Sequence, residues 1–279
     1  MAYYIFSGEL LNINNGISIN NRAFRYADGL FESMFYTNGK LMFLDQHYKR
    51  LIEGMKLLRI KSANLPNKDE LKDQILKLIE ANEIIGAARV RLQVFRAEGG
   101  LYLPESNDCE YIIEANDIAN TEYTLNTKGF HIGISKSIKR YANKFSQIKT
   151  TSKQEMVIAA MDAKDNKWDD AIMISTTGNI METTSSNIFA IINHNIYTPN
   201  IDDGALNGIM RQNIIKIAEE NDYSVIETSL KESNLLAADE IFITNAIKGI
   251  QWVVAYKNKR YFNNISKKLL TLLNKKIYE

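Results

Sequence analysis

The sequence has a single cysteine, Cys109, so the chain cannot form an internal disulfide bond. Proteins of reducing compartments use cysteine in this sparing way, and we therefore expect a cytoplasmic location. The sequence also lacks a surplus of either charge, because 34 lysine and arginine residues stand against 33 aspartate and glutamate residues. A nucleic-acid groove or a polybasic membrane patch usually produces an imbalance, so both functions are disfavoured.

Long apolar runs are missing as well. No stretch approaches the roughly 20 consecutive apolar residues that a membrane-spanning helix needs. The first six residues have neither a basic region nor a long apolar core, so we expect no signal peptide. Hydrophobic residues make up 45% and charged residues 24% of the 279 residues, a balance typical of soluble globular proteins. A chain of this length and composition buries enough surface to fold without disulfide bonds or a structural metal ion.

Strand-like runs and amphipathic helical segments are mixed along the whole chain. The strongest short-range signal is Asn38-Gly39 between two strand-like runs, which predicts a hairpin. Asp45 is expected to cap the helix that follows it. The predicted strands cover residues 2–6, 9–13, 17–19, 33–36, 40–44, 88–95, 111–115, 130–135, 171–175, 187–192, 196–198, 224–228, 240–244 and 251–256. The other predicted helices cover residues 68–81, 152–164, 209–221 and 265–273.

A polar, aperiodic stretch over residues 117–128 separates two halves of the chain. Neither half shows the regular βαβ alternation of a Rossmann fold. We therefore expect an α+β protein with two α+β domains. The smaller N-terminal domain is expected over residues 1–116, residues 117–128 form the linker, and the larger C-terminal domain covers residues 129–279.

The segment Gly204-Ala205-Leu206-Asn207-Gly208 leads directly into the predicted helix that begins near Ile209. Glycines let the backbone approach an anion closely, and the free N–H groups of a first helical turn attract negative charge. The spacing is neither a Walker A loop nor G-x-G-x-x-G. By itself the segment is more often a plain glycine turn before a helix, and a phosphate site is the alternative.

Two isolated residues are chemical candidates. Lys149 lies in a polar turn before a helical segment, and a lysine amine with a lowered pKa forms Schiff bases with aldehydes. Glu182 follows a glycine turn, and a carboxylate can hold a proton on a ring nitrogen by stabilising its cationic form. On physical grounds alone, a lysine or glutamate in such a position is more often a solvated surface charge.

The order of several motifs resembles one known family. The segments occur in this order: Asp28-Gly29-Leu30-Phe31-Glu32, His47-Tyr48-Lys49-Arg50-Leu51, Lys149-Thr150, Glu182-Thr183-Thr184-Ser185-Ser186-Asn187-Ile188-Phe189 and Asn207-Gly208-Ile209-Met210-Arg211. Together they resemble the class IV, fold-type IV pyridoxal-phosphate (PLP) enzymes. That family includes branched-chain and D-amino-acid aminotransferases and 4-amino-4-deoxychorismate lyase. The resemblance extends from about Tyr3 to Val254.

The resemblance implies a role for each matching residue. Lys149 would form the aldimine with PLP and move the proton between the substrate α-carbon and the cofactor. Glu182 would pair with the pyridine nitrogen, which keeps PLP an effective electron sink. The phosphate contacts would come from the Arg50 side chain, the N–H groups of Ile209 and Met210, and Thr244.

The substrate residues are less well defined by the resemblance. Phe31 lies in the first motif, and Tyr102 lies in a Gly99–Tyr102 segment that resembles a substrate loop of lyase relatives. Leu101 replaces an arginine of that loop. Arg96 matches an arginine of the same region and would contact a substrate carboxylate or support the strand end. Two further departures are Ala27 in place of a glycine and Met210 in place of a threonine, and the second removes a side-chain phosphate contact.

For other polar residues the structural interpretation is preferred or equal. His47 is expected to order the helix that carries Arg50. Arg22 and Arg25, with Tyr26, would line the mouth of a pocket or form surface pairs. His131 and His194 have no metal-ligand spacing, so we predict no metal site.

The family resemblance implies a homodimer with PLP in the cleft between the two domains and an amino acid or 2-oxo acid as substrate. The favoured reaction is amino-group transfer from an amino acid to a 2-oxo acid. The first alternative is 4-amino-4-deoxychorismate lyase chemistry, which releases pyruvate and 4-aminobenzoate. Lyase-like features are Asn207–Gln212 and Ala238-Asp239-Glu240, whereas Leu101 favours an aminotransferase. The remote alternative is a non-catalytic PLP-binding protein.

Overall fold

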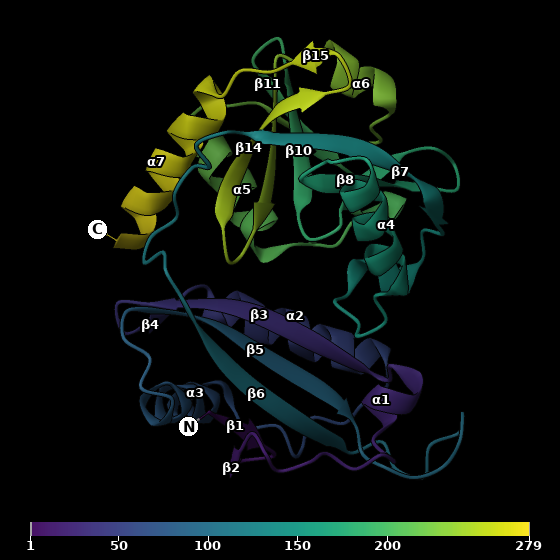
Figure 1. Ribbon diagram of the computed structural model, residues 1–279, viewed down its shortest axis with the longest axis vertical. Coiled ribbons are helices and arrows are strands. Elements are labelled where there is room, and N and C mark those ends of the chain that lie inside the picture. The colour runs from purple at the N-terminus through teal and green to yellow at the C-terminus, as the bar shows by residue number, and fades with distance from the viewer. Residues whose placement is uncertain (1, 279) are drawn as a thin grey trace. The chain divides into compact units, whose positions relative to one another are not determined.

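The computed structural model describes residues 2–278 and divides into two compact units (Figure 1). Unit 1 comprises Met1–Thr121 and Ile148–Ser152, and unit 2 comprises Glu122–Gln147 and Lys153–Glu279. The short Ile148–Ser152 segment therefore groups with the N-terminal residues, although the sequence placed it within the C-terminal half. Its backbone hydrogen bonds to the N-terminal sheet account for this grouping.

Unit 1 is built on a six-stranded antiparallel sheet in the order β2-β1-β6-β5-β3-β4. The strands are β1 (Tyr3–Phe6), β2 (Glu9–Asn12), β3 (Gly29–Thr37), β4 (Lys40–Leu41), β5 (Ala87–Arg96) and β6 (Cys109–Ile118). Asn38 and Gly39 both have positive φ angles, 50° and 76°, so the predicted β3–β4 hairpin is confirmed. The strand predicted at residues 17–19 is wrong, because Ile17 and Ile19 lie exposed in an irregular segment.

Three helices complete unit 1: α1 (Arg22–Tyr26), α2 (Leu44–Leu57) and α3 (Lys68–Ala81). Leucine and isoleucine side chains of α2 and α3 are buried against one face of the sheet in a shared core. The bounds of α3 are as predicted, and Asn67 and Glu70 form a capping box at its start. The prediction that Asp45 caps α2 is wrong: α2 begins at Leu44, and its N-cap is Phe43 in a left-handed conformation without a side-chain cap.

Unit 2 is built on a mixed nine-stranded sheet in which eight strands follow the order β12-β11-β10-β13-β14-β7-β8-β9 and β15 pairs with β14. Three neighbouring pairs are parallel, β11–β12, β14–β7 and β7–β8. The strands are β7 (Phe130–Arg140), β8 (Asp170–Ser175), β9 (Ile180–Thr183), β10 (Asn187–Ile192), β11 (Asn195–Pro199), β12 (Val225–Thr228), β13 (Glu240–Asn245), β14 (Gly249–Tyr256) and β15 (Lys259–Arg260). Strand β9, which carries Glu182, was not predicted.

The helical segments of unit 2 connect and cover these strands. They are η1 (Lys144–Gln147), α4 (Gln154–Asp165), η2 (Ile201–Asp203), α5 (Ile209–Glu219), α6 (Glu232–Ala237) and α7 (Asn264–Tyr278). Helices α4, α5 and α7 confirm predicted helices, whereas the short α6 was not predicted. A core of β-branched and other apolar side chains from β7, β8, β10, β13 and β14 is fully buried. The mixture of helix and strand in both units confirms the α+β fold class.

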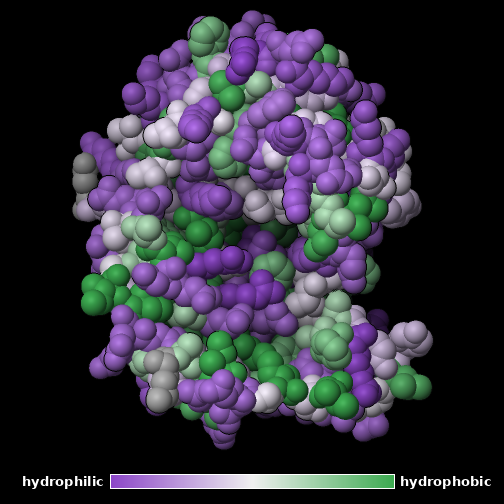
Figure 2. All heavy atoms as spheres, in the orientation of Figure 1, coloured by the Kyte–Doolittle hydropathy of each residue, from purple (hydrophilic) through white to green (hydrophobic). Residues whose placement is uncertain are grey.

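Polar side chains cover much of the face drawn in Figure 2, with apolar ones interspersed. Within residues 2–278, no helix has both the length and the apolar character needed to cross a membrane.

Candidate functional site

Backbone hydrogen bonds from β3 position Lys149. The Phe31 N–H donates to the carbonyl oxygen of Lys149 at 2.9 Å, and the Thr151 N–H donates to that of Gly29 at 2.9 Å. Leu30 and Thr150 form an isolated antiparallel bridge between these bonds. The Lys149 residue is therefore held as part of an extended segment beside β3. Its Nζ lies 4.6 Å from the centroid of the Phe31 ring, a cation–π distance.

The departure at Ala27 is accommodated by the backbone. Ala27 is the C-cap of α1 and has a left-handed conformation, with φ 51° and ψ 33°. Glycine adopts this conformation without a steric penalty, whereas alanine carries a modest cost. The carbonyl oxygen of Ala27 accepts a hydrogen bond from Thr151 Oγ1 at 2.7 Å. A hydrogen bond thus connects the left-handed turn at Ala27 to the segment that carries Lys149.

A second cation contacts the same aromatic ring. The guanidinium carbon of Arg91 lies 3.9 Å from the Phe31 ring centroid, so Arg91 and Lys149 are neighbours around one side chain. Burial lowers the pKa of Arg91 below its ordinary value. Arg91 also donates to Gln93 Oε1 at 2.7 Å. Sequence reasoning missed Arg91, because no motif distinguishes it from the adjacent arginines of β5.

Arg50 is held by a buried carboxylate. Glu32 accepts hydrogen bonds from Arg50 Nε at 2.8 Å and from His47 Nδ1 at 2.6 Å. Burial opposes the ionisation of Glu32, but the Arg50 charge and the His47 hydrogen bond hold its pKa at about 2. Burial lowers the pKa of His47, so a neutral ring donates through Nδ1 to the ionised carboxylate. These contacts agree with the expected role of His47 in ordering the helix of Arg50.

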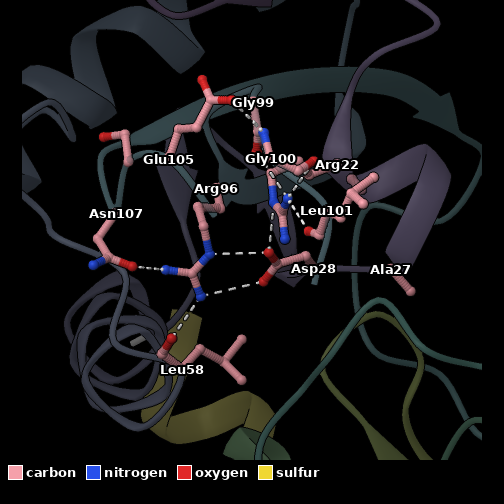
Figure 3. Close-up of polar contacts among 12 residues, drawn as sticks. Arg22, Ala27, Asp28, Leu58, Arg96, Gly99, Gly100, Leu101, Glu105 and Asn107 are labelled. Carbon is pink, nitrogen blue, oxygen red and sulfur yellow. Dashed lines mark hydrogen bonds and ion pairs between the residues drawn. The ribbon is translucent and has the colours of Figure 1, made fainter. Parts of the chain in front are cut away.

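Arg96 lies in a second polar network of unit 1, in which Asp28 is shared by two arginines (Figure 3). Arg96 donates to Asp28, to the carbonyl oxygens of Leu58 and Arg59, and to the side chain of Asn107. The Arg96 side chain is buried and its guanidinium is surrounded by these acceptors. The contacts favour its structural role over direct contact with a substrate carboxylate.

The other arginine of this network, Arg22, holds the loop that follows β5. Its Nη1 donates to the carbonyl oxygens of Gly99 at 2.9 Å and Leu101 at 2.7 Å (Figure 3). Arg22 is buried and pairs with Asp28, so the surface pair expected from the sequence is wrong. The tip of the loop is open: Leu101 is 72% and Tyr102 91% exposed. The substrate role of Tyr102 stays a prediction.

In unit 2, Glu182 lies on β9 with its carboxylate buried. Its Oε1 accepts from Arg140 Nη1 at 2.6 Å, and its Oε2 accepts from the Leu206 N–H at 3.4 Å. The second bond connects Glu182 to the turn that precedes α5. The carboxylate and the candidate phosphate segment therefore lie side by side in the same unit.

The turn before α5 is crowded at position 208 and favours glycine there. A Cβ atom there would lie 1.9 Å from Oδ1 of Asn187, far inside van der Waals contact. Asn187 holds the turn by donating to the carbonyl oxygen of Leu206 at 2.8 Å. Gly208 is the N-cap of α5 without a side-chain cap, and the first turn contains no acidic residue. The buried residues Ile209 and Met210 thus begin a helix whose first N–H groups suit an anion.

Thr244 adds a donor to this site. It lies on β13 directly opposite Asn187 on β10, and it is 1% exposed. Its Oγ1 has no hydrogen-bond partner within the described residues. A buried hydroxyl without a partner is costly, and a bound anion would satisfy it. The donor set around Gly208 therefore fits a phosphate group, including at Met210, where the backbone donor remains.

The predicted cofactor residues fall into two sets. Unit 1 carries Arg50 and Lys149, with Phe31 against the lysine, and unit 2 carries Glu182, Ile209, Met210 and Thr244. His131 and His194 do not belong to any group of three His, Cys, Asp or Glu side chains suited to a metal ion, and no such group exists within residues 2–278. Arg140 and Asn187 were missed in the sequence because their partners lie far along the chain.

Comparisons with known proteins indicate the family to which the chain belongs. A Methanocaldococcus jannaschii protein, provisionally named a branched-chain-amino-acid aminotransferase, is 29% identical over 91% of this chain and 88% of its own length. A solved Legionella pneumophila protein, provisionally named 4-amino-4-deoxychorismate lyase, has a TM-score of 0.84 and 27% identity, covering 95% of this chain and 96% of that one.

The fold of a third protein is also close. The branched-chain aminotransferase of the thermophilic archaeon Thermoproteus uzoniensis, solved with norvaline, has a TM-score of 0.87 at 22% identity, covering 97% of this chain and 92% of that one. The sequence profile of the family described as amino-transferase class IV matches residues 29–256. The chain therefore belongs to the class IV aminotransferase family of enzymes.

Proposed function

We propose that this enzyme is a PLP-dependent aminotransferase that moves an amino group from an amino acid to a 2-oxo acid. The observation that carries the proposal is that two candidate binding groups lie next to each other in unit 2. The N–H groups at the start of α5 fit a phosphate, and the buried Glu182 carboxylate beside them can accept a hydrogen bond from a ring nitrogen. PLP carries a phosphate and a basic ring nitrogen on one small molecule, and it supplies an aldehyde and an electron sink when bound.

The residues of unit 2 would hold the cofactor. The first N–H groups of α5 and the Thr244 hydroxyl would donate to the phosphate oxygens, while Asn187 keeps the turn open for them. Glu182 would accept a hydrogen bond from the protonated ring nitrogen. Because Met210 lacks a hydroxyl, residue 210 would contact the phosphate through its backbone N–H alone.

The residues of unit 1 would act on the substrate. Lys149 would bond to the cofactor at rest and, once displaced, carry the proton from the substrate α-carbon to the cofactor carbon. Arg50, fixed by Glu32, would supply a further phosphate donor. Arg91, beside Lys149 at the Phe31 ring, would attract a substrate carboxylate.

The second candidate is 4-amino-4-deoxychorismate lyase activity. The likeness to the Legionella pneumophila protein supports it, since that protein covers nearly the same length. The lyase would use the same cofactor residues and the same proton removal by Lys149, and its substrate also carries carboxylates. The exposed Leu101, in place of an arginine, favours the aminotransferase.

Visible absorption tests the cofactor. The purified protein reconstituted with PLP should absorb in the visible range, and borohydride reduction followed by mass spectrometry should locate a phosphopyridoxyl group on Lys149. Lys149→Ala should remove the absorption and the activity. Lys144→Ala, an exposed lysine of the neighbouring η1, is the matched control and should change neither. A folded protein that stays colourless with PLP would refute the proposal.

A donor panel tests the reaction. Branched-chain L-amino acids, D-alanine, glutamate and aminodeoxychorismate would be offered with 2-oxo acid acceptors. Amino transfer that requires the acceptor supports the aminotransferase. Formation of 4-aminobenzoate without such transfer would replace it by the lyase.

We also propose that the enzyme is a homodimer, as the family resemblance implies. Light scattering on the eluting protein should give twice the 31.9 kDa chain mass. A monomer of full activity would contradict this.

A further inference from the structure

Arg140 lies buried between two carboxylates at the end of β7. Its Nη1 donates to Glu182 Oε1 at 2.6 Å, and its Nε donates to Glu155 Oε2 at 3.0 Å. The side chains of Arg140 and Glu182 are 8% and 7% exposed, whereas that of Glu155, in the first turn of α4, is 49% exposed. The guanidinium thus links the buried carboxylate to a half-exposed one.

The backbone around this cluster is well fixed. Arg140 pairs with Ser175 across the parallel β7–β8 ladder, and its carbonyl oxygen accepts from the Thr176 N–H at 2.9 Å. Glu182 pairs with Met173 on the other side of β8. The two side chains therefore project from β7 and β9, the strands on either side of β8, and the ion pair between them selects one orientation of the Glu182 carboxylate.

The cluster of Arg140, Glu155 and Glu182 has more negative than positive charge. Two carboxylates share one guanidinium, so the three side chains together carry one net negative charge, divided between the buried Glu182 and the half-exposed Glu155. The remaining oxygen, Glu182 Oε2, accepts a long 3.4 Å bond from the Leu206 N–H. A buried carboxylate oxygen in this state is a good acceptor for an additional positively charged donor.

We infer that Arg140 is a positioning residue for the cofactor: it holds Glu182 Oε1 so that Oε2 faces a protonated ring nitrogen. The inference rests on the proposed function and deepens it. The hydrogen bond from Arg140 Nε to Glu155 opposes rotation of the guanidinium away from Glu182. Without Arg140, the Glu182 side chain would lose its fixed orientation and the ring nitrogen its aligned acceptor.

A purely structural role for Arg140 makes a different prediction. If Arg140 only offsets a buried charge, its removal weakens every ligand of unit 2 alike. If it acts through Glu182 on the ring nitrogen, its removal weakens only ligands that carry that nitrogen. PLP and 1-deaza-PLP, in which a C–H group replaces the ring nitrogen, separate the two roles.

The experiment compares the affinity of apoprotein for the two cofactors by absorbance titration. Wild type should prefer PLP over 1-deaza-PLP by about tenfold or more, since the difference is a charge-assisted hydrogen bond. Arg140→Met should lower the PLP affinity by a similar factor, leave the 1-deaza-PLP affinity within about twofold and so remove the preference. Arg140→Lys should recover part of the preference for PLP over 1-deaza-PLP. Lys139→Met, an exposed neighbour on β7, is the control and should keep the wild-type preference.

Two results would overturn the inference. An equal loss of affinity for both cofactors in Arg140→Met would leave Arg140 a structural role only, and unchanged affinities for both cofactors would leave it no role. Should Arg140→Met not fold, as judged by thermal unfolding of the apoprotein, Arg140→Lys decides by the same ratio. Wild type that binds neither cofactor would instead refute the proposed function, so the two failures are distinct.

Discussion

At the scale of single residues, Glu32 shows how one buried carboxylate holds both Arg50 and His47. It is 2% exposed and accepts from both Arg50 and His47. Burial alone would raise its pKa, yet the Arg50 charge and the His47 hydrogen bond lower it to about 2. Glu32 is thus ionised at every pH at which the enzyme is expected to work, and it keeps Arg50 in place before any ligand arrives.

This carboxylate predicts a pH dependence of stability. Its pKa in the folded chain lies below the ordinary value of 4.5, so the unfolded chain takes up the proton first as the pH falls. The stability from Glu32 is complete above pH 4.5 and is lost as the pH falls towards about 2, by about 3 kcal/mol in total. Urea unfolding at a series of pH values should therefore show a shallower decline in Glu32→Gln than in wild type.

The matched control for Glu32 is Glu53→Gln, which changes an exposed glutamate on α2. The free energy of unfolding of Glu53→Gln should fall as steeply with decreasing pH as that of wild type. Equal slopes for Glu32→Gln and wild type in this window would show that Glu32 is not held ionised by its neighbours.

At the scale of elements, Arg22 on α1 organises the loop after β5. Its guanidinium bridges Asp28 and the backbone carbonyls of Gly99 and Leu101, and Gly100 N–H donates to Glu105 Oε1 at 3.1 Å (Figure 3). Gly99 and Gly100 have φ angles of 110° and 72°, which favour glycine. The loop is therefore a shaped element, although its apolar tip is exposed.

Removing this arginine should loosen the loop. Arg22→Met loses the donors to the loop carbonyls, so the amides of Gly100–Glu105 should exchange hydrogen about tenfold faster or more. Hydrogen exchange followed by mass spectrometry measures this. Arg25→Met is the matched control, because Arg25 lies on the same helix and donates to the carbonyl of Ile19 instead. Unchanged exchange in Arg22→Met would mean that the glycine turns alone shape the loop.

Helices and strands could be predicted where the residues that determine them are close together in the sequence. Helix α3 could be predicted to the residue, because its apolar spacing and the Asn67–Glu70 capping box are both written in the local sequence. The start of α2 could not, because Phe43 adopts a left-handed conformation that no local signal indicates. Residues 17–19 have strand-like composition but lie exposed outside the described sheets, and an unpaired strand is not stable.

At the scale of the whole molecule, the proposed cofactor residues are divided between two compact units. Lys149 and Arg50 belong to unit 1, and Glu182, Thr244 and the start of α5 belong to unit 2. Unit 1 includes Ile148–Ser152 although this segment is flanked on both sides by residues of unit 2. If both sets serve one cofactor molecule, binding must affect both units.

Hydrogen exchange tests this coupling. PLP should slow exchange at the Ile148–Ser152 segment in unit 1 and at the first turn of α5 in unit 2. Inorganic phosphate alone should slow exchange only at α5, because it lacks the aldehyde that bonds to Lys149. Thr244→Val, which removes the unpartnered hydroxyl while keeping the shape of the side chain, should weaken the phosphate effect. Protection by PLP confined to one unit would contradict a shared cofactor.

The sequence by itself determined the family and the α+β class, and it predicts the principal chemical residues. Lys149, Glu182 and the Gly204–Gly208 turn belong to short motifs whose order along the chain is specific. These signals are local, because each depends on a few adjacent residues and on the chemistry that a cofactor imposes.

Only the tertiary structure decided which side chains support those residues. Arg140 meets Glu182, Asp28 meets Arg96, and Arg91 meets the Phe31 ring, each across strands that are distant in sequence. Strand pairing and register create these contacts, and they depend on the buried faces of whole sheets rather than on neighbouring residues. For the same reason Arg96 could be recognised as a motif arginine, while its engagement by Asp28 and Asn107 became visible only in the fold.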